Sequence, residues 1–221
     1  HAGKKLIVLT KDAPRFAHAI CEAGQATQVE WLNQQPSHDP PSRQTALEFD
    51  RLAGDVYVLA QATEPNQTCV LYSDREPIAT TTVGGTCDAA TKGRLGKARS
   101  RGVKGCTRLA TVAGEGDVVT AEYRKLGKRA LGVVAWLRKR ELTLRDHAAL
   151  CDGKEPSCWR VDDGNQWDPG SFSVLTAFRS PHGLELAITW AGAEGENATL
   201  YRAIGPKLEE VVTTYRYWNP E

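Results

Sequence analysis

Six cysteines carry the clearest chemical pattern in the chain. No two of them show the two-residue spacing of zinc ligands or of a dithiol redox motif, and their even count favours disulfide bonds. Cys151 and Cys158 enclose a polar, turn-rich segment, so we predict that these two pair, while the other four cysteines allow three connectivities. Six buried thiols in a cytosolic protein are the alternative. The predicted disulfide residues are Cys21, Cys69, Cys87, Cys106, Cys151 and Cys158.

Cys87 could instead serve as a nucleophile. It lies between a predicted strand and a predicted basic helix, where the helix N-terminus and nearby cations would favour a thiolate. His147 or His182 could then act as the base. This hypothesis requires a free thiol, whereas the even cysteine count favours a bond from Cys87, for example to Cys106 across the basic segment.

A dense group of cations, here called the basic segment, occupies residues 92–104. Glycines are interspersed among these cations, and exposed backbone N–H groups together with cations can hold phosphate, sulfate or carboxylate. The spacing lacks the order of a P-loop, and Tyr123 and Trp136 are the only aromatic residues within 92–145, which disfavours nucleic acid. We therefore expect a protein or an anionic polymer such as a polysaccharide as the partner. The predicted anion-binding residues are Lys92, Arg94, Lys97, Arg99, Arg101 and Lys104.

The net charge of +1 hides an uneven distribution. Residues 92–145 hold 15 of the 28 Lys and Arg residues against four acids, so this stretch carries +11 and the rest of the chain carries −10. The alternative to an anion-binding site is therefore a solvated basic face that the protein's own acidic residues partly neutralise.

The N-terminal residue suggests a metal site. The chain begins with His1 and contains no Met, so we expect a processed or cut N-terminus. A mature N-terminal histidine offers its α-amine and its imidazole to one copper ion, and a second histidine would complete three nitrogen ligands. A histidine left from a purification tag is the simpler alternative. The candidate second ligands are His18, His38, His147 and His182.

One predicted loop combines tryptophans with carboxylates. The acidic turn at residues 162–168 could donate oxygen atoms to calcium, although its spacing does not match an EF-hand loop. Trp159 and Trp167 flank this turn and could stack a sugar ring or anchor a protein partner. The alternative is that both indoles cover the open end of a sheet. Beyond copper or calcium, no cofactor is expected.

Catalytic motifs of useful specificity are missing from the sequence. No Gly-x-Ser-x-Gly elbow occurs, and nothing marks one pair of carboxylates as general acid and base. We therefore assign no catalytic residue and favour binding over catalysis.

The first third of the chain predicts alternating strands and helices. Apolar runs rich in β-branched residues indicate strands, helical spacing of apolar residues indicates helices, and a proline-rich stretch must be a loop. We predict strands at 4–10, 28–32 and 55–61, helices at 13–23 and 45–52, and a loop at 35–42.

The rest of the chain predicts mostly strands. We expect strands at 68–72 and 77–83, a basic helix at 88–101, and further strands at 108–112, 118–123, 131–137 and 141–145, although 117–130 also fits a helix. The last third predicts four strands joined by short turns, at 171–179, 184–190, 198–203 and 209–217. Short turns between consecutive strands favour an antiparallel meander. The longest apolar runs are too short for a membrane helix.

Together these patterns predict an α+β protein, with a mixed strand-helix N-terminal part and an antiparallel β-meander in the C-terminal part. Residues 1–221 form one domain, or split weakly into 1–145 and 171–221 joined by the loop 146–170. We expect an exported protein, periplasmic or secreted, that binds or interacts with a partner. Two alternatives stay open: an exported enzyme, either a copper-dependent oxidase or a hydrolase of unrecognised motif, and a structural accessory domain of a larger exported assembly.

Overall fold

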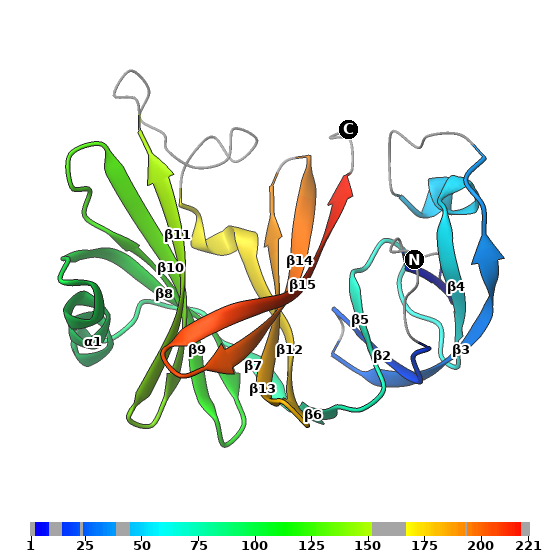
Figure 1. The fold of residues 1–221 in the computed structure, drawn as a ribbon, viewed down its shortest axis with the longest axis horizontal. Coiled ribbons are helices and arrows are strands. Elements are labelled where there is room, and N and C mark those ends of the chain that lie inside the picture. The colour runs from blue at the N-terminus through cyan, green and yellow to red at the C-terminus, as the bar shows by residue number, and fades with distance from the viewer. Residues whose placement is uncertain are drawn as a thin grey trace.

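The computed structural model describes residues 3–8, 15–22, 24–38, 45–151, 167–192 and 194–217. Within these residues the protein is mostly β and forms two sheets, a five-stranded sheet followed by a ten-stranded sheet (Figure 1). The ten-stranded sheet curls into a nearly closed barrel. No helix of the described residues is long and apolar enough to cross a membrane.

The five-stranded sheet is built from the first third of the chain and has the order β1-β4-β3-β2-β5. Its neighbouring strands are all antiparallel, and a 3-10 helix, η1 (Ala46–Arg51), precedes β4. Leu6, Tyr57 and Leu59 are among the residues of its core. The strands are β1 (Lys5–Val8), β2 (His18–Cys21), β3 (Ala26–Gln35), β4 (Gly54–Leu59) and β5 (Cys69–Tyr72).

The ten-stranded sheet has the order β6-β12-β13-β14-β15-β11-β10-β9-β8-β7. One α-helix, α1 (Ala89–Arg99), precedes its long strands and one 3-10 helix, η3 (Pro169–Ser171), lies before β12. The strands are β6 (Glu76–Ile78), β7 (Thr80–Thr82), β8 (Val103–Val112), β9 (Gly116–Tyr123), β10 (Arg129–Arg138), β11 (Glu141–Leu150), β12 (Phe172–Ser180), β13 (Gly183–Ala191), β14 (Gly195–Ile204) and β15 (Lys207–Tyr217).

The two edges of this sheet meet through one short segment of chain. β6 pairs with β12 and β7 pairs with β8, yet only Ala79 lies between β6 and β7. A sheet whose two edge strands are continuous in this way closes on itself, which removes most of its free edges.

The barrel wall has the fewest paired residues between β11 and β15. These neighbours run parallel and share a single register pair, Leu144 with Lys207, whereas every other neighbouring pair of strands in the sheet is antiparallel. Beyond that pair β15 runs obliquely away from β11 (Figure 1). The described strands therefore leave the wall open on this side.

The inner and outer faces of the barrel are both apolar near α1. On β10, Val134 and Trp136 belong to the inner core, whereas Val133 and Ala135 belong to the outer core under Leu95 of α1. Because side chains alternate between the two faces of a strand, covering both faces requires a continuous apolar run. This explains why the sequence from 131 to 137 is apolar at every position but one, Gly132.

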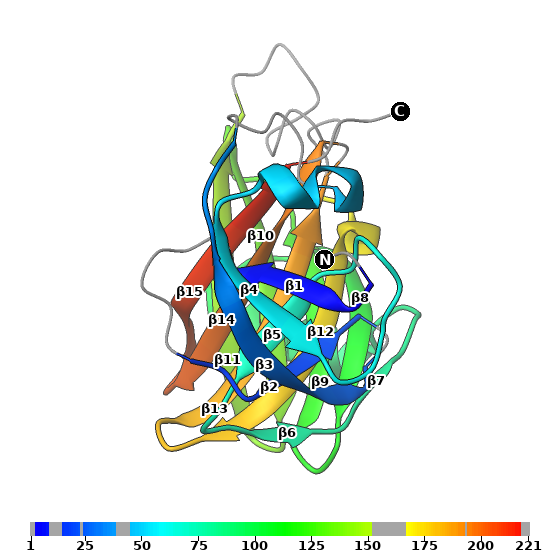
Figure 2. The ribbon, with the colours of Figure 1, turned by 90° about the vertical axis from the view of Figure 1, so that its right-hand side faces the viewer.

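The small sheet lies against one side of the barrel (Figure 2), and side chains on the facing surfaces of the two sheets pack together. Two buried residues of the small sheet, Ile20 and Tyr72, share one hydrophobic core with four buried residues of the barrel. The barrel residues are Leu175, Phe178, Ala187 and Leu200. Nearby, the carboxylate of Glu185 is fully buried and accepts from Arg75 at 2.6 Å and from Arg202 at 2.7 Å. Two guanidinium partners therefore compensate the one buried carboxylate.

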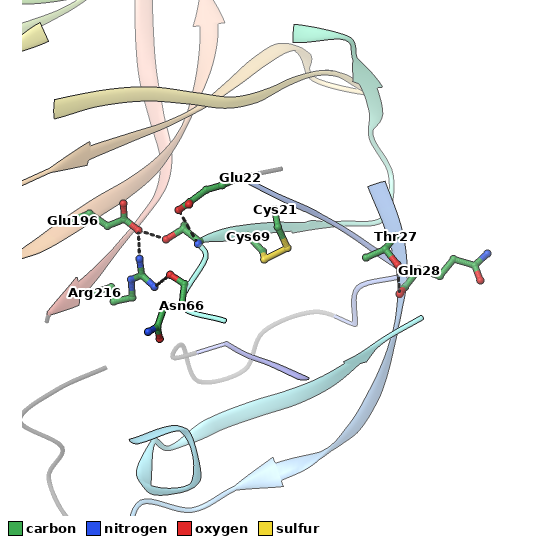
Figure 3. The surroundings of a disulfide bond; sticks show 9 residues. Cys21, Glu22, Thr27, Gln28, Asn66, Cys69, Glu196 and Arg216 are labelled. Atoms are coloured by element: carbon green, nitrogen blue, oxygen red, sulfur yellow. Dashed lines mark hydrogen bonds and ion pairs between the residues drawn. A yellow bond between two sulfur atoms is a disulfide. The ribbon is translucent and has the colours of Figure 1, made fainter. Parts of the chain in front are cut away.

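A polar contact reinforces this packing beside the first disulfide (Figure 3). Cys21 of β2 is bonded to Cys69 of β5, and the preceding residue, Thr68, donates its hydroxyl to Glu196 of β14. Arg216 of β15 also donates to Glu196 and reaches the carbonyl oxygen of Asn66. The edge strand of the small sheet is thus tied to the barrel next to a covalent bond.

The prediction of an α+β fold is wrong, because the described N-terminal part contains strands where helices were expected. The segment 18–21 is strand β2, with Ala19 buried in the small sheet and Ile20 buried against the barrel. A strand that is buried on both faces has a run of apolar residues that can also fit a helix.

The second expected helix, at 45–52, is a shorter helix of the 3-10 type. Residues 46–51 form the 3-10 helix η1, and Thr45 makes no side-chain capping bond, so the predicted capping box is not formed. Instead the carbonyl oxygen of Thr45 accepts from the N–H of Glu48 at 3.1 Å.

Several local predictions are confirmed. The basic helix is α1, whose N-cap residue Asp88 accepts from the N–H of Thr91 at 2.7 Å, and the last four strands β12 to β15 form the expected antiparallel meander. The helical alternative for 117–130 is wrong, since β9 occupies its first half and β10 begins at its end. The chain changes from one sheet to the other between Tyr72 and Glu76, and strands on both sides of 146–170 belong to the same ten-stranded sheet.

Candidate ligand site in the barrel

Four aromatic rings gather on the inside of the barrel at the end where β11 finishes and β12 begins. The ring of His147 lies 5.4 Å from Trp167, 6.2 Å from Phe172 and 5.1 Å from Trp190, measured between centroids. Phe172 stacks on Trp190 at 5.2 Å and lies 4.9 Å from Trp167. We call these four residues the aromatic cluster.

Trp167 is held in this cluster by the strands beneath it. Its indole N–H donates to the hydroxyl of Thr120 on β9 at 3.0 Å, and only 8% of the residue is exposed. The ring lies over Gly132 of β10, where an added Cβ would be 2.5 Å from a ring atom. Gly132 pairs with His147 across β10 and β11, so the missing side chain of the glycine makes room for the indole beside the imidazole.

A charged pair borders the cluster on the open side of the barrel wall. Arg145 of β11 lies 3.5 Å from the carboxylate of Glu210 on β15, and their side chains are 39% and 40% exposed. The guanidinium carbon of Arg145 is 5.8 Å from the ring centroid of Tyr201. Burial raises the pKa of Tyr201 above its ordinary value, an effect that the nearby Arg145 opposes.

The inner wall also carries polar atoms without partners. Four buried nitrogen atoms on β10 and β11 make no hydrogen bond, and three of them are N–H groups that can only donate. The cross-strand register places their side chains on the same face as the inner core. A buried donor without a partner costs about 1–3 kcal/mol. These atoms are Trp136 Nε1, Arg138 Nε, Arg145 Nε and His147 Nε2.

His147 is uncharged in the barrel at neutral pH. Burial lowers its pKa from the ordinary 6.5 to about 4, and the positive charge of Arg145 adds to this shift while Asp146 opposes it. Removing the imidazole from water disfavours its protonated form. Because His147 is neutral, the positive charge next to the aromatic cluster comes from Arg145, which precedes His147 by two residues on β11.

Burial decreases from the middle of the barrel toward this end. On β15 the inward residue Leu208 is 2% exposed, whereas Glu210 is exposed, and on β13 Ile188 is buried whereas Trp190 is only half-buried. Solvent therefore reaches His147, Trp190 and the charged pair, whereas Trp167, Phe172 and the apolar residues behind them are buried. Such a combination of flat apolar walls and a few polar groups is typical of small-molecule sites.

The predicted anion-binding residues lie on the outer side of the barrel, and most of them contact the protein itself. Arg99 pairs with Asp146 at 2.9 Å and Lys104 with Glu122 at 2.9 Å. Arg94 donates to the carbonyl oxygen of Glu141, and Arg101 donates to that of Arg129. Lys92 and Lys97 make no ion pair within the described part of the chain.

The disulfide prediction is confirmed for four cysteines. Besides the bond between Cys21 and Cys69, Cys87 is bonded to Cys106, which ties the start of α1 to β8. Cys87 therefore has no thiol, and its prediction as a nucleophile is wrong. Cys151 is also disulfide-bonded, while the predicted partner Cys158 lies outside the described residues.

The predicted metal residues are not brought together where they are described. His18 stacks on Tyr72 at 5.3 Å, His147 lies in the barrel, and His182 is exposed in the turn between β12 and β13. No group of three or more potential metal ligands occurs among the described residues. His1 and the acidic residues 162–166 lie outside them.

The two tryptophans predicted to face a partner have different outcomes. Trp159 lies outside the described residues. Trp167 is buried in the aromatic cluster rather than displayed on a loop surface, because its indole occupies the space over Gly132. Asp168, the last residue of the predicted calcium turn, accepts from the N–H of Gly170 at 2.8 Å and caps η3.

Four residues of this site were not predicted from the sequence: Arg145, Phe172, Trp190 and Glu210. A signal was present in β11, where the polar residues Thr143, Arg145 and His147 alternate with other residues. This period of two indicates that all three face the same side of a strand. Comparison of the chain with protein-family models, with curated proteins and with solved structures gives no match.

Proposed function

We propose that the protein is an exported binding protein that holds a small ligand with a flat apolar body inside the open end of its barrel. The observation that carries this proposal is the aromatic cluster of His147, Trp167, Phe172 and Trp190, placed beside Arg145, whose buried Nε has no partner. Export is supported by the disulfides, which form and persist in oxidising compartments.

The arrangement of the rings supports binding. A fully packed barrel core fills its interior with side chains, and behind the cluster these are mostly aliphatic, with Trp136 and Tyr201 among them. At the open end the interior side chains are aromatic or charged, and solvent reaches His147, Trp190, Arg145 and Glu210. Flat rings bind apolar ligands by burial and stacking, and the unpaired Nε of Arg145 beside them can fix the orientation of an acceptor group.

The proposal is tested with N-phenyl-1-naphthylamine, an uncharged aromatic fluorophore. We expect saturable binding of one probe per protein, with energy transfer from the indoles of the barrel to the probe. Replacing Trp190→Ala removes one wall of the site and should weaken binding about tenfold, since an aromatic contact contributes on the order of 1 kcal/mol beyond burial.

The matched control is Trp31→Ala. Trp31 lies on the small sheet, where Arg15 covers its ring at 3.5 Å, and this change should leave probe affinity unaltered. Near-ultraviolet circular dichroism checks that both variants are folded. Lack of saturable binding by the wild-type protein overturns the proposal and favours a structural accessory domain, which would be recovered from its native source in a persistent complex.

A further inference from the structure

We infer that the barrel site selects ligands carrying a carboxylate, which Arg145 binds in exchange for its contact with Glu210. The inference rests on the proposed binding function and adds the chemical class of the ligand. It depends on three observations: the loose contact between Arg145 and Glu210, the unpartnered Nε of Arg145, and the position of Arg145 relative to the aromatic cluster.

Among the described residues, the contact between Arg145 and Glu210 is the longest of the ion pairs formed by arginines of the barrel. Its nitrogen and oxygen atoms are 3.5 Å apart, whereas Arg202 lies 2.7 Å from Glu185 and Arg138 lies 2.6 Å from Glu141. Charge-assisted hydrogen bonds have distances of about 2.7–2.9 Å, and ion pairs exposed to water contribute little. Glu210 is therefore a weak competitor for an incoming carboxylate.

The guanidinium of Arg145 has an unused donor on its buried side. Its Nε is buried and makes no hydrogen bond, although a carboxylate can accept from Nε and a terminal nitrogen of the same guanidinium at once. This donor needs an acceptor atom, which a carboxylate supplies and an ammonium group does not.

The other charged groups on this face are already paired more closely. Arg138 contacts Glu141 at 2.6 Å, and Glu122 contacts Lys104 at 2.9 Å. Asp146, next to Arg145 in sequence, lies on the outer face, where it pairs with Arg99. Arg145 is accordingly the cation of this group whose partner is easiest to exchange.

The position of Arg145 would place the rest of such a ligand on the aromatic cluster. His147 follows Arg145 by two residues on the same face of β11, and its ring is 5.1 Å from Trp190 and 5.4 Å from Trp167. A carboxylate on Arg145 therefore points a flat apolar body toward these rings. A fully buried ligand charge is avoided, because Arg145 lies at the partly exposed edge of the site.

Two ligands of nearly the same shape test the inference by isothermal titration calorimetry. 2-Naphthoate carries a carboxylate, and 2-naphthamide is its uncharged counterpart. We expect the wild-type protein to bind 2-naphthoate at least tenfold more tightly than 2-naphthamide at pH 7.5. The variant Arg145→Gln should lose this preference while it retains affinity for 2-naphthamide, and Arg145→Lys should restore part of it.

The variant Glu210→Gln tests the exchange independently. It removes the competing carboxylate, so affinity for 2-naphthoate should rise severalfold while affinity for 2-naphthamide stays the same. The control Arg99→Gln removes a cation on the outer face and should change neither affinity. If Arg145→Gln does not fold, the ligand pair and Glu210→Gln still decide the question.

The outcomes separate this inference from the proposed function. Equal affinity of the wild-type protein for the two ligands, or an equal loss of both in Arg145→Gln, overturns the selection for a carboxylate but leaves a binding site for flat apolar ligands. Failure of the wild-type protein to bind 2-naphthoate, 2-naphthamide and N-phenyl-1-naphthylamine overturns both.

Discussion

Two regions of this molecule are rich in positively charged nitrogen, and they differ in what those nitrogen atoms contact. In the basic segment, four of the six cations bind carboxylates or carbonyl oxygens of the protein itself, namely Arg94, Arg99, Arg101 and Lys104. Inside the barrel, Arg145 contacts a carboxylate oxygen only at 3.5 Å, and its buried Nε has no partner. Arg101 of the basic segment also has a buried Nε without a partner, but its terminal nitrogen donates to a carbonyl oxygen at 2.7 Å. The region that looks strongest in the sequence is thus largely occupied by internal contacts.

This difference indicates that a binding surface is marked by cations that lack close partners, and not by a high density of charge. A solvated cation loses little when it has no partner, because water replaces the contact. A buried donor has no water in place of a missing partner. A ligand acceptor that reaches it therefore forms a hydrogen bond without breaking one between the donor and water. Three predictions test this comparison, from the largest expected effect to the smallest.

The largest effect concerns the pH dependence of stability. His147 has a pKa of about 4 in the folded protein and 6.5 when unperturbed, so below pH 6.5 the unfolded chain takes up a proton that the folded protein resists. Stability contributed by the neutral imidazole is fully present above pH 6.5 and is lost as the pH falls toward 4. At about 1.4 kcal/mol for each pKa unit, the loss approaches 3 kcal/mol.

Urea denaturation between pH 7.5 and 4.5 measures this loss. The variant His147→Gln cannot titrate, so its free energy of unfolding should fall less steeply than that of the wild-type protein across the same range. The control His182→Gln, in an exposed turn, should follow the wild-type curve. Parallel curves for His147→Gln and the wild type would show that the imidazole is not buried as described.

The second effect compares one glycine from each region. Gly132→Ala places a Cβ against the ring of Trp167, which its bond to Thr120 holds in place, so we expect a destabilisation of about 1–3 kcal/mol. Gly93→Ala lies inside α1, where no atom is within 4 Å of the new Cβ, and should stabilise the protein by about 0.5–1 kcal/mol.

Chemical denaturation and near-ultraviolet circular dichroism measure both changes. The aromatic signal should change in Gly132→Ala and stay constant in Gly93→Ala. Destabilisation by Gly132→Ala together with stabilisation by Gly93→Ala would support tight packing at the aromatic cluster and open space around α1. A Gly132→Ala variant of unchanged stability would mean that the aromatic cluster is loosely packed.

The smallest effect concerns the basic segment. Arg99→Ala should change the free energy of unfolding by less than about 1 kcal/mol, because its ion pair with Asp146 is partly exposed. Anion binding by this segment stays a prediction, with exposed Lys97 and half-buried Lys92 as its least occupied cations. Heparin affinity chromatography at low salt tests it directly.

Replacing Arg94, Lys97, Arg99 and Arg101 together by Ala should weaken retention on heparin and reduce its salt dependence. Arg145→Gln should leave retention unchanged, because Arg145 faces the inside of the barrel. No retention of the wild-type protein would exclude an acidic polymer as a partner of the basic segment.

The sequence predicted those parts of the fold that depend on local signals. The turns between β12, β13, β14 and β15 separate four extended runs, and the basic helix predicted at 88–101 is α1, so both features were found. The error at 18–21 has a different origin, because the burial of both faces of β2 depends on a barrel that comes later in the chain.

The candidate site was harder to predict for the same reason. Trp190 and His147 approach each other only because the barrel closes, and neither residue has an unusual sequence context. The period of two in β11 indicates that Arg145 and His147 share a face, but it does not indicate whether that face is inside or outside. The disulfides were predicted from the number and spacing of the cysteines, although the connectivity of the first four was left open.

The closing segment of the barrel also constrains the order in which the chain can fold. Ile78 of β6 pairs with Ala177 of β12, so the first barrel strand to be synthesised cannot complete its pairing until β12, much later in the chain, has been made. Structures dominated by such distant contacts fold slowly, on a scale of about milliseconds to seconds. Until closure, the edges of β8 and β12 have hydrogen-bonding groups without neighbours, which other chains can pair with. Protecting these edges during synthesis is therefore a requirement for a good yield of native protein, whatever the stability of the finished barrel.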